Sequence, residues 1–415
     1  MSTAKLAERA AEHLHFLCVH LPTRAVGSQG NRDATTYAAE VCRAAGWQVE
    51  TPTFQCMAWD ENGADLAAES AAFEVFASPY TLPAHVSAPL VVLNTIEDLE
   101  GADLTGKVVL LCGDLTKNQL APKNFPWWNP EEHQRIIAAL EKASPLAILA
   151  ATTRNPETAG AVYPFPLIED GDFDIPSAFM TEEEGQKLAA SAGGKIDLEI
   201  RARRMLSEGC NVVARKGGSG LTGNARTIVT AHIDAKRGTP GALDDGTGVV
   251  VLLLLAELLR DYDGDQVIEL AALNGEDYYD ASGERLYVEQ NADMSTIALV
   301  INIDCAAYRE GATHFSLYEC PEDVAGRVRA VLSEHGLAEG PQWYQGDHSI
   351  FVMGGRPAVA ITSALLYDLM AEITHTTRDT PEIVDPAKVA QIAQALQALL
   401  TWVLSVQDLR GLTPE

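Results

Sequence analysis

The chain has 415 residues, of which 47% are apolar and 21% are charged, a composition typical of a folded globular protein. Its 58 acidic residues outnumber the 30 basic ones and give a formal net charge of −28. Because such an excess repels phosphate groups and anionic lipid, we expect neither nucleic acid nor a membrane as a partner. At roughly 100–200 residues per domain, the chain has room for two or three domains.

Residues 1 to about 60 predict a helix, a loop, a second helix and a strand. The first helix ends near Leu21-Pro22, and the second, through ATTYAAEVCRAAGW, stops at Gly46. No basic head precedes an apolar segment, so we do not expect a signal peptide. The longest apolar run, 249–256, is too short to cross a bilayer. Seven scattered cysteines without a C-x-x-C pair indicate reduced thiols and a cytoplasmic location.

The pattern of apolar residues changes in the middle of the chain and predicts a small, mostly-β domain there. Short β-branched runs (LVVL, KVVLLC, LAILAA and IDLEIRAR) are separated by loops, and one helical stretch, EEHQRIIAALEKA, interrupts them. We therefore predict an inserted domain over 85–204, with a larger domain built from 1–84 and 205–415. The pair Trp127-Trp128 is either a contact surface or part of the inserted domain's own core.

From Asn211 onward, apolar strands alternate with amphipathic helices as far as a last helix over 386–406. Continuous apolar strands such as RTIVTA and QVIELAAL predict an α/β fold with a mostly parallel twisted sheet covered by helices on both faces. Gly218, Gly220 and Gly223 match the dinucleotide fingerprint G-x-G-x-x-G. A strand follows them where that fingerprint needs a helix, so we interpret them as a loop.

In the part of the chain after Asn211, side chains of the kinds that bind metal ions occur where each apolar strand ends. In open α/β sheets, ligands bind outside the carboxyl ends of the strands. Two of the residues lie in loops ahead of helices, and the others follow strands directly. The residues at these positions are His232, Asp234, Asp244, Glu276, Asp277, Asp304 and His375.

Each of these residues has an ordinary structural explanation when it is taken alone. An aspartate before a helix is commonly an N-cap, and a histidine beside an aspartate is commonly a hydrogen-bonded pair. The convergence of five such residues on one sheet edge favours a metal site instead. Two imidazoles and several carboxylates suit Zn²⁺ first, and Co²⁺ or Mn²⁺ next.

Three carboxylates and two histidines exceed what one tetrahedral zinc uses while keeping an open position. The set fits two ions about 3.5–4 Å apart with a bridging carboxylate, which is a hydrolytic arrangement. Asp234 is placed to accept the second N–H of the His232 imidazole. Cys305, if it continues the strand beyond Asp304, points to the opposite face.

These segments resemble the M28 zinc aminopeptidases. TAHIDAKRGTPGALDDGTGV, NGEDYYDASGERLYV, NIDC, GDHSIF and THTTRDTPEIVD occur in the order and at the spacing of that family. RAVGSQG and AAGWQVETPTF are similar to its N-terminal region. The stretch 85–203, with LTGKVVLLCGD and DIPSAFMTEEEGQKLA, resembles the protease-associated domain that many members carry. The resemblance covers nearly the whole chain and is strongest over 226–390.

The resemblance implies a zinc-peptidase fold and a role for each site residue. His232 and Asp304 would bind one ion, Asp277 and His375 the other, and Asp244 would bridge them, with Glu276 as general base. The family usually has Glu-Glu where this chain has Glu276-Asp277, so the side chain of Asp277 is shorter by one methylene group. No oxyanion donor is obvious, and the candidates by proximity in the sequence are Tyr344 and His348.

The implied activity is that of an aminopeptidase, which removes N-terminal residues from peptides with a water held between two ions. The alternatives are a carboxypeptidase or dipeptidase of the same family, then a glutaminyl cyclase-like acyltransferase, which generally needs one zinc. A third alternative is a binding protein that keeps the fold with an inactive site. The expected partner is a peptide substrate, and the inserted domain is a candidate interface for a homodimer.

Overall fold

The computed structural model describes residues 1–21, 23–125, 128–154, 163–218 and 226–403. The chain divides into two compact units, one formed by Met1–Cys56 with Glu208–Glu415 and the other by Met57–Ser207. The second unit starts earlier in the chain than residue 85, because the long strand β2 (Thr53–Ala68) continues into its sheet. The identity of this unit as a protease-associated domain stays a prediction.

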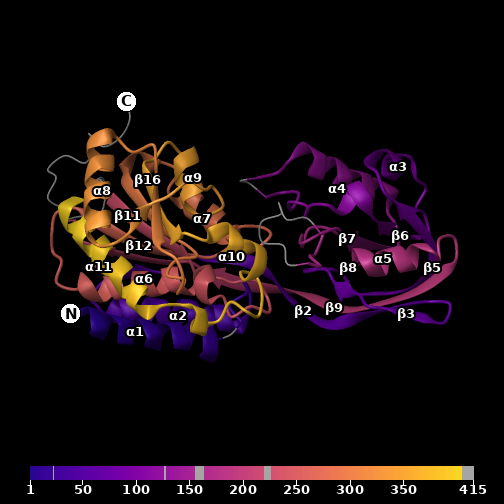
Figure 1. Ribbon diagram of the computed structural model, residues 1–415, viewed down its shortest axis with the longest axis horizontal. Helices are drawn as coiled ribbons and strands as arrows, with labels where there is room; N and C mark the ends of the chain where they lie inside the picture. Colours follow the sequence, from indigo (N-terminus) through magenta and orange to yellow (C-terminus); the bar gives the residue numbers. More distant parts are fainter. Residues whose placement is uncertain (22, 126–127, 155–162, 219–225, 404–415) are drawn as a thin grey trace. The chain divides into compact units, whose positions relative to one another are not determined.

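The first unit contains an eight-stranded sheet (Figure 1). In spatial order its strands are β1 (Gln48–Glu50), β10 (Val212–Lys216), β12 (Val267–Leu273), β11 (Arg226–His232), β13 (Ile297–Ile303), β16 (Ala358–Ser363), β14 (Thr313–Tyr318) and β15 (Ala338–Glu339). The four central strands, from β12 to β16, are parallel to one another, and β10 and β14 flank them in antiparallel pairing. The predicted mostly parallel sheet is therefore confirmed.

Helices cover both faces of this sheet (Figure 1). One face packs against α1 (Thr3–His15), α2 (Gln29–Ala44), α6 (Thr247–Leu258), α8 (Glu322–Glu334) and α11 (Pro386–Val403). The other face packs against α7 (Ser282–Gln290) and α9 (His348–Met353). The short helix α10 (Leu366–Glu372) follows β16. Because both faces are covered, β11, β12 and β13 are buried on both sides and consist mostly of apolar residues.

The helix α6 is the most deeply buried of these elements. Every residue over 247–256 is buried, so the helix has no polar face, as expected for a helix enclosed by other elements. Full burial of each Val or Leu side chain contributes about 1.5–3 kcal/mol. The loop that precedes α6 is thereby anchored to the core of the unit, next to the carboxyl ends of the central strands.

The second unit contains its own eight-stranded sheet and three α-helices within the residues described. The strands are β3 (Ala71–Phe73), β2, β9 (Lys195–Cys210), β5 (Ala84–Leu93), β6 (Val108–Leu111), β7 (Ala147–Thr152), β8 (Ser177–Thr181) and β4 (Phe76–Ala77). The sequence predicted α4 (Glu131–Ala143) but not α3 (Ile96–Gly101) or α5 (Glu182–Ala189). Both missed helices are short, and each begins at a threonine cap.

Some sequence-based interpretations fall outside the described residues. Gly220 and Gly223 of the fingerprint, Trp127, and the end of the last helix over 404–406 belong to this group. Trp128 is described, and it is an exposed side chain whose ring contacts His133 edge-on. Among the described helices, none combines the length and apolar composition that a bilayer crossing requires.

Candidate metal centre

The five predicted ligands and Glu276 come together at the carboxyl ends of the central strands. His232 is the last residue of β11, Glu276 and Asp277 follow β12, and Asp304 follows β13. Their side-chain ligand atoms form three overlapping groups, and within each group these atoms lie within 4.8 Å of one another. The groups are His232 with Asp244 and Asp304, Asp244 with Asp277 and His375, and His232 with Glu276 and Asp277.

Asp244 is common to two of these groups and faces both histidines. Its Oδ1 lies 3.0 Å from Nε2 of His232, and its Oδ2 lies 3.1 Å from Nε2 of His375. Nε2 of His375 is also 3.0 Å from Oδ1 of Asp277, whereas Nε2 of His232 is 4.0 Å from Oδ1 of Asp304. One carboxylate therefore joins two triads, each of one histidine and two aspartates.

The neighbouring residues Asp244 and Asp245 have different roles. The backbone at both positions departs from helical angles just before α6. Oδ1 of Asp245 accepts the N–H of Gly248 at 2.9 Å, so Asp245 caps the buried helix while Asp244 is free to turn toward the histidines. The N-cap residue of α6 is Gly246, and Asp245, one residue earlier, supplies the acceptor for the first turn, whereas Asp244 does not.

Asp234 holds the loop that carries Glu276 and Asp277. Its Oδ1 accepts the N–H of Gly275 at 2.9 Å, and its Oδ2 accepts the N–H of Asp277 at 3.1 Å. Its distance to Nδ1 of His232 is 3.7 Å, longer than a hydrogen bond. Asp234 is thus adjacent to the imidazole, as expected, but its hydrogen bonds go to the loop backbone.

The ionisable side chains of the site are close together and buried, so each one affects the pKa values of the others. Burial opposes a charged imidazolium, but the carboxylates of Asp234 and Asp244 outweigh it and set the pKa of His232 well above its ordinary value. Burial raises the pKa of Asp304 to about 7. Burial, together with the charges of Asp277 and Asp304, sets the pKa of Glu276 well above its ordinary value.

The donor set fits divalent cations. Neither ring nitrogen of His232 makes a hydrogen bond of good geometry, although the side chain is only 1% exposed. Such a buried imidazole is costly unless another partner uses its nitrogen atoms. The carboxyl groups at the centre would carry four negative charges (Asp244, Glu276, Asp277 and Asp304), and two divalent ions would supply four positive ones.

The structure does not bring Tyr344 or His348 into these groups. Nε2 of the buried His348 lies 2.8 Å from the carbonyl oxygen of Trp343, and burial lowers the pKa of His348 to about 4. The Tyr344 side chain is exposed, and its hydroxyl donates to Gln342. The expectation for Cys305 needs a correction: β13 ends at Ile303, and Cys305 lies beyond it with a φ of 50°.

Two residues that support the centre were not singled out from the sequence. Asp379, four residues after His375, accepts the backbone N–H groups of Leu243 and Asp244, and Arg24 donates to carbonyl oxygens of the same loop. Both lie in segments that resemble the family, which is the only signal the sequence offers for them. Their hydrogen bonds join segments far apart in the chain, so local patterns do not reveal them.

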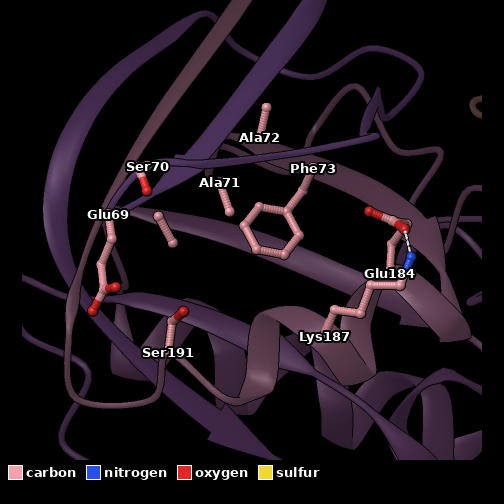
Figure 2. Close-up of a pocket in the computed structure, with 9 residues that line it drawn as sticks. Glu69, Ser70, Ala71, Ala72, Phe73, Glu184, Lys187 and Ser191 are labelled. Atoms are coloured by element: carbon pink, nitrogen blue, oxygen red, sulfur yellow. Dashed lines mark hydrogen bonds and ion pairs between the residues drawn. The ribbon is translucent and has the colours of Figure 1, made fainter.

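The second unit contains a separate pocket of about 400 Å³ (Figure 2). It lies between the turn around Glu69 and Ser70 and the helix α5, with Phe73 on one side. Lys187 and Glu184 form an ion pair at its edge, with Nζ and Oε1 2.5 Å apart. Its lining has no imidazole or thiol, so it lacks the donor groups that the centre in the first unit provides.

Residues 211–400 match the family model of peptidase family M28. Carboxypeptidase Q from Bos taurus is 23% identical over 349 residues, which cover 80% of this chain and 70% of that protein. The probable lipoprotein aminopeptidase LpqL from Mycobacterium tuberculosis is 25% identical over 299 residues, covering 69% and 55%. The structure of BSAP, a zinc aminopeptidase from Bacillus subtilis, is similar with a TM-score of 0.73 at 20% identity over 96% of this chain and 94% of that one.

The family match and the cluster of metal-ligand side chains identify this protein as a metallopeptidase, a hydrolase. Residues 211–400 of the chain belong to peptidase family M28. The expected fold class and the resemblance drawn from the motifs are thus confirmed.

Proposed function

We propose that the protein is an exopeptidase that uses two zinc ions to remove N-terminal residues from peptides. The observation that carries this proposal is the position of Asp244, whose two oxygens face His232 and His375 at 3.0 and 3.1 Å. A carboxylate in that position suits a bridge between two ions. The names of the similar proteins, which include aminopeptidases and a zinc aminopeptidase, support the choice of metal and of trimming end.

The two triads assign a ligand set to each ion. His232 and Asp304 would hold one ion, Asp277 and His375 would hold the other, and Asp244 would contact both. Imidazole and carboxylate ligands are compatible with zinc, and also with Co²⁺ or Mn²⁺ as substitutes. The chemistry that such ions supply when bound is polarisation of the peptide carbonyl and a lower pKa for the attacking water.

Glu276 is the general base in this proposal. Its side chain is 24% exposed, more than those of the neighbouring aspartates, and its Oε2 lies 4.0 Å from Nε2 of His232. Because burial and nearby carboxylates raise its pKa, it can accept a proton from the attacking water and later deliver it to the departing amine. Asp234 supports this role by holding the backbone on both sides of Glu276.

The test is a peptide-ladder assay on the purified enzyme with and without a chelator, followed by addition of metal. We expect products shortened from the amino end, loss of activity with the chelator and recovery with zinc. Glu276→Gln should keep the ions and lose roughly 10²–10⁴-fold in turnover. Near wild-type turnover in this variant would refute the role of Glu276.

A carboxypeptidase is the second candidate, because carboxypeptidase Q matches 80% of the chain. Products shortened from the carboxyl end would select it, and cleavage of dipeptides alone would select a dipeptidase. One bound ion per chain would favour the cyclase-like acyltransferase. No hydrolysis of any substrate by the fully loaded protein would favour an inactive binding homologue.

The cytoplasmic location and the homodimer stay proposals. The seven cysteines are free, which agrees with a reducing location. Fractionation of cells tests the location, and the mass of the protein in solution tests the homodimer.

A further inference from the structure

A fully buried arginine lies behind the loop that carries Asp244. Arg24, in the segment before α2, is 0% exposed. Its Nε donates to the carbonyl oxygen of Ile233 at 3.0 Å, although 209 residues separate them in the chain. Its two terminal nitrogens donate to the carbonyl oxygens of Pro240 at 2.7 Å and of Gly241 at 2.8 Å. The guanidinium thus joins the backbone after His232 to the backbone before Asp244.

The partners of Arg24 are unusual for a buried charge. A buried cation is ordinarily paired with a carboxylate, because removing it from water is costly. Among the described residues, Arg24 forms no such ion pair; its remaining hydrogen bonds go to the carbonyl oxygen of Leu17 and to Sγ of Cys18. Nearly all of its donor capacity is therefore used to hold backbone and none to neutralise an acid directly.

Asp379 complements Arg24 on the next part of the same loop. Its Oδ1 accepts the N–H of Leu243 at 2.7 Å, and its Oδ2 accepts the N–H of Asp244 at 3.1 Å. Its carbonyl oxygen accepts the N–H of Ala242 at 3.2 Å. Asp379 is also buried; burial and then the charge of Asp244 raise the pKa of its carboxyl to about 7, and its hydrogen bonds to the loop and the positive charge of Arg24 oppose this rise.

Gly241 shows how closely the loop is enclosed between these groups. Its φ is +61°, in the left-handed region that side chains rarely adopt. A Cβ atom on this residue would lie 2.9 Å from a terminal nitrogen of Arg24 and 2.6 Å from the carbonyl oxygen of Asp244. The path of the backbone from 240 to 244 therefore has little freedom.

We propose that Arg24 and Asp379 are positioning residues that set the place of the Asp244 carboxylate between the two histidines. The guanidinium of Arg24 holds the carbonyl groups of 240 and 241, and the carboxylate of Asp379 holds the N–H groups of 243 and 244. The inference rests on the proposed metal centre. Its consequence is that Arg24, which contacts no predicted ligand side chain, controls the affinity for the metal pair.

The test compares Arg24→Lys with wild type by metal titration against a competing chelator. Lysine keeps the charge but has three donors in place of the planar fork of five, so it cannot hold all four carbonyl groups at once. We expect affinity for the metal pair to fall roughly 10- to 100-fold, as for other residues that orient ligands. The absorption spectrum of the Co²⁺-loaded protein should also change, which a purely stabilising residue would not cause.

The matched control is Arg215→Lys. Arg215 lies in the same unit, and its Nε is 2.6 Å from the buried Glu269 carboxylate, in the middle of β12 rather than at the metal centre. We expect this control to lower the melting temperature and to leave the metal affinity and the Co²⁺ spectrum unchanged. Equal loss of affinity in both variants would show that general destabilisation, not positioning, is responsible.

Asp379→Asn provides a second, independent variant if Arg24→Lys does not fold. The amide keeps the shape but replaces one acceptor with a donor that faces a backbone N–H, so we expect a comparable loss of metal affinity. If wild type binds two ions and the folded variants bind them with unchanged affinity, the positioning proposal is overturned. If wild type binds no metal pair, the proposed metal centre itself fails.

Discussion

The carboxylate of Asp234 accepts the backbone N–H of Asp277 at 3.1 Å, across 43 residues of chain. The same carboxylate accepts the N–H of Gly275, so it holds the loop on both sides of Glu276. A residue that was expected to orient an imidazole instead holds the loop that carries the proposed general base and one proposed metal ligand. Its position links the ends of the two neighbouring strands β11 and β12.

Replacing Asp234 should consequently affect catalysis more than folding. In Asp234→Asn, one acceptor oxygen becomes an amide group that cannot accept from a backbone N–H. We expect a loss of roughly 10- to 100-fold in metal affinity or activity, measured by chelator competition and steady-state kinetics. Circular dichroism of the same sample provides the control for folding. Unchanged kinetics with bound metal would contradict this role.

Asp277→Glu tests whether the shorter acidic side chain is required. Oδ1 of Asp277 lies 3.0 Å from Nε2 of His375, and its Oδ2 accepts the N–H of Lys236 at 3.0 Å. A longer side chain cannot keep both contacts without moving the loop. Although the family usually has glutamate here, we expect weaker binding of the ion shared with His375. Tighter binding of this ion in a metal titration would show that the loop adapts freely.

Metal uptake should release protons. Burial opposes the charged imidazolium, but the carboxylates of Asp277 and Asp244 set the pKa of His375 well above its ordinary value, as Asp234 and Asp244 do for His232. Both imidazoles must be neutral to bind an ion, so protons compete with the metal. The metal affinity therefore falls as the pH falls, by about tenfold per pH unit for each proton displaced. Calorimetry in buffers of different ionisation enthalpy measures this release. Absence of proton release would contradict the raised pKa values of His232 and His375.

The stability of the metal-free protein should depend on pH through Asp379. Burial, and then the charge of Asp244, raise the pKa of this carboxyl from 3.8 to about 7. The folded state therefore binds the proton more tightly than the unfolded state, and this contribution to stability is present below about pH 4 and is lost as the pH rises through about 7.

Thermal unfolding of chelator-treated protein checks this dependence. The stability of wild type minus that of Asp379→Asn should fall as the pH rises across this window, because the asparagine does not titrate. Taking the difference cancels contributions from the other titrating groups. A difference that is constant with pH would show that Asp379 has an ordinary pKa.

Sequence alone identified the members of the site because each lies where an apolar strand ends or a helix is about to begin. Parallel strands place their carboxyl ends at one edge, so the rule brings His232, Glu276 and Asp304 together without any coordinates. The mostly parallel sheet followed from the same continuous apolar runs, since only strands covered on both faces lack alternation. Local composition was sufficient for these conclusions.

Tertiary structure decided how those residues face one another and what holds them. Neither the orientation of the Asp244 oxygens nor the contacts of Asp234 follows from local periodicity, because loop backbones are set by hydrogen bonds from distant segments. Arg24 illustrates the reason: a lone arginine in a sequence reads as a surface residue, and only the folded chain shows it buried against carbonyl groups more than two hundred residues away. The sequence alone indicated which residues gather at the candidate centre, and packing between remote segments determined its geometry.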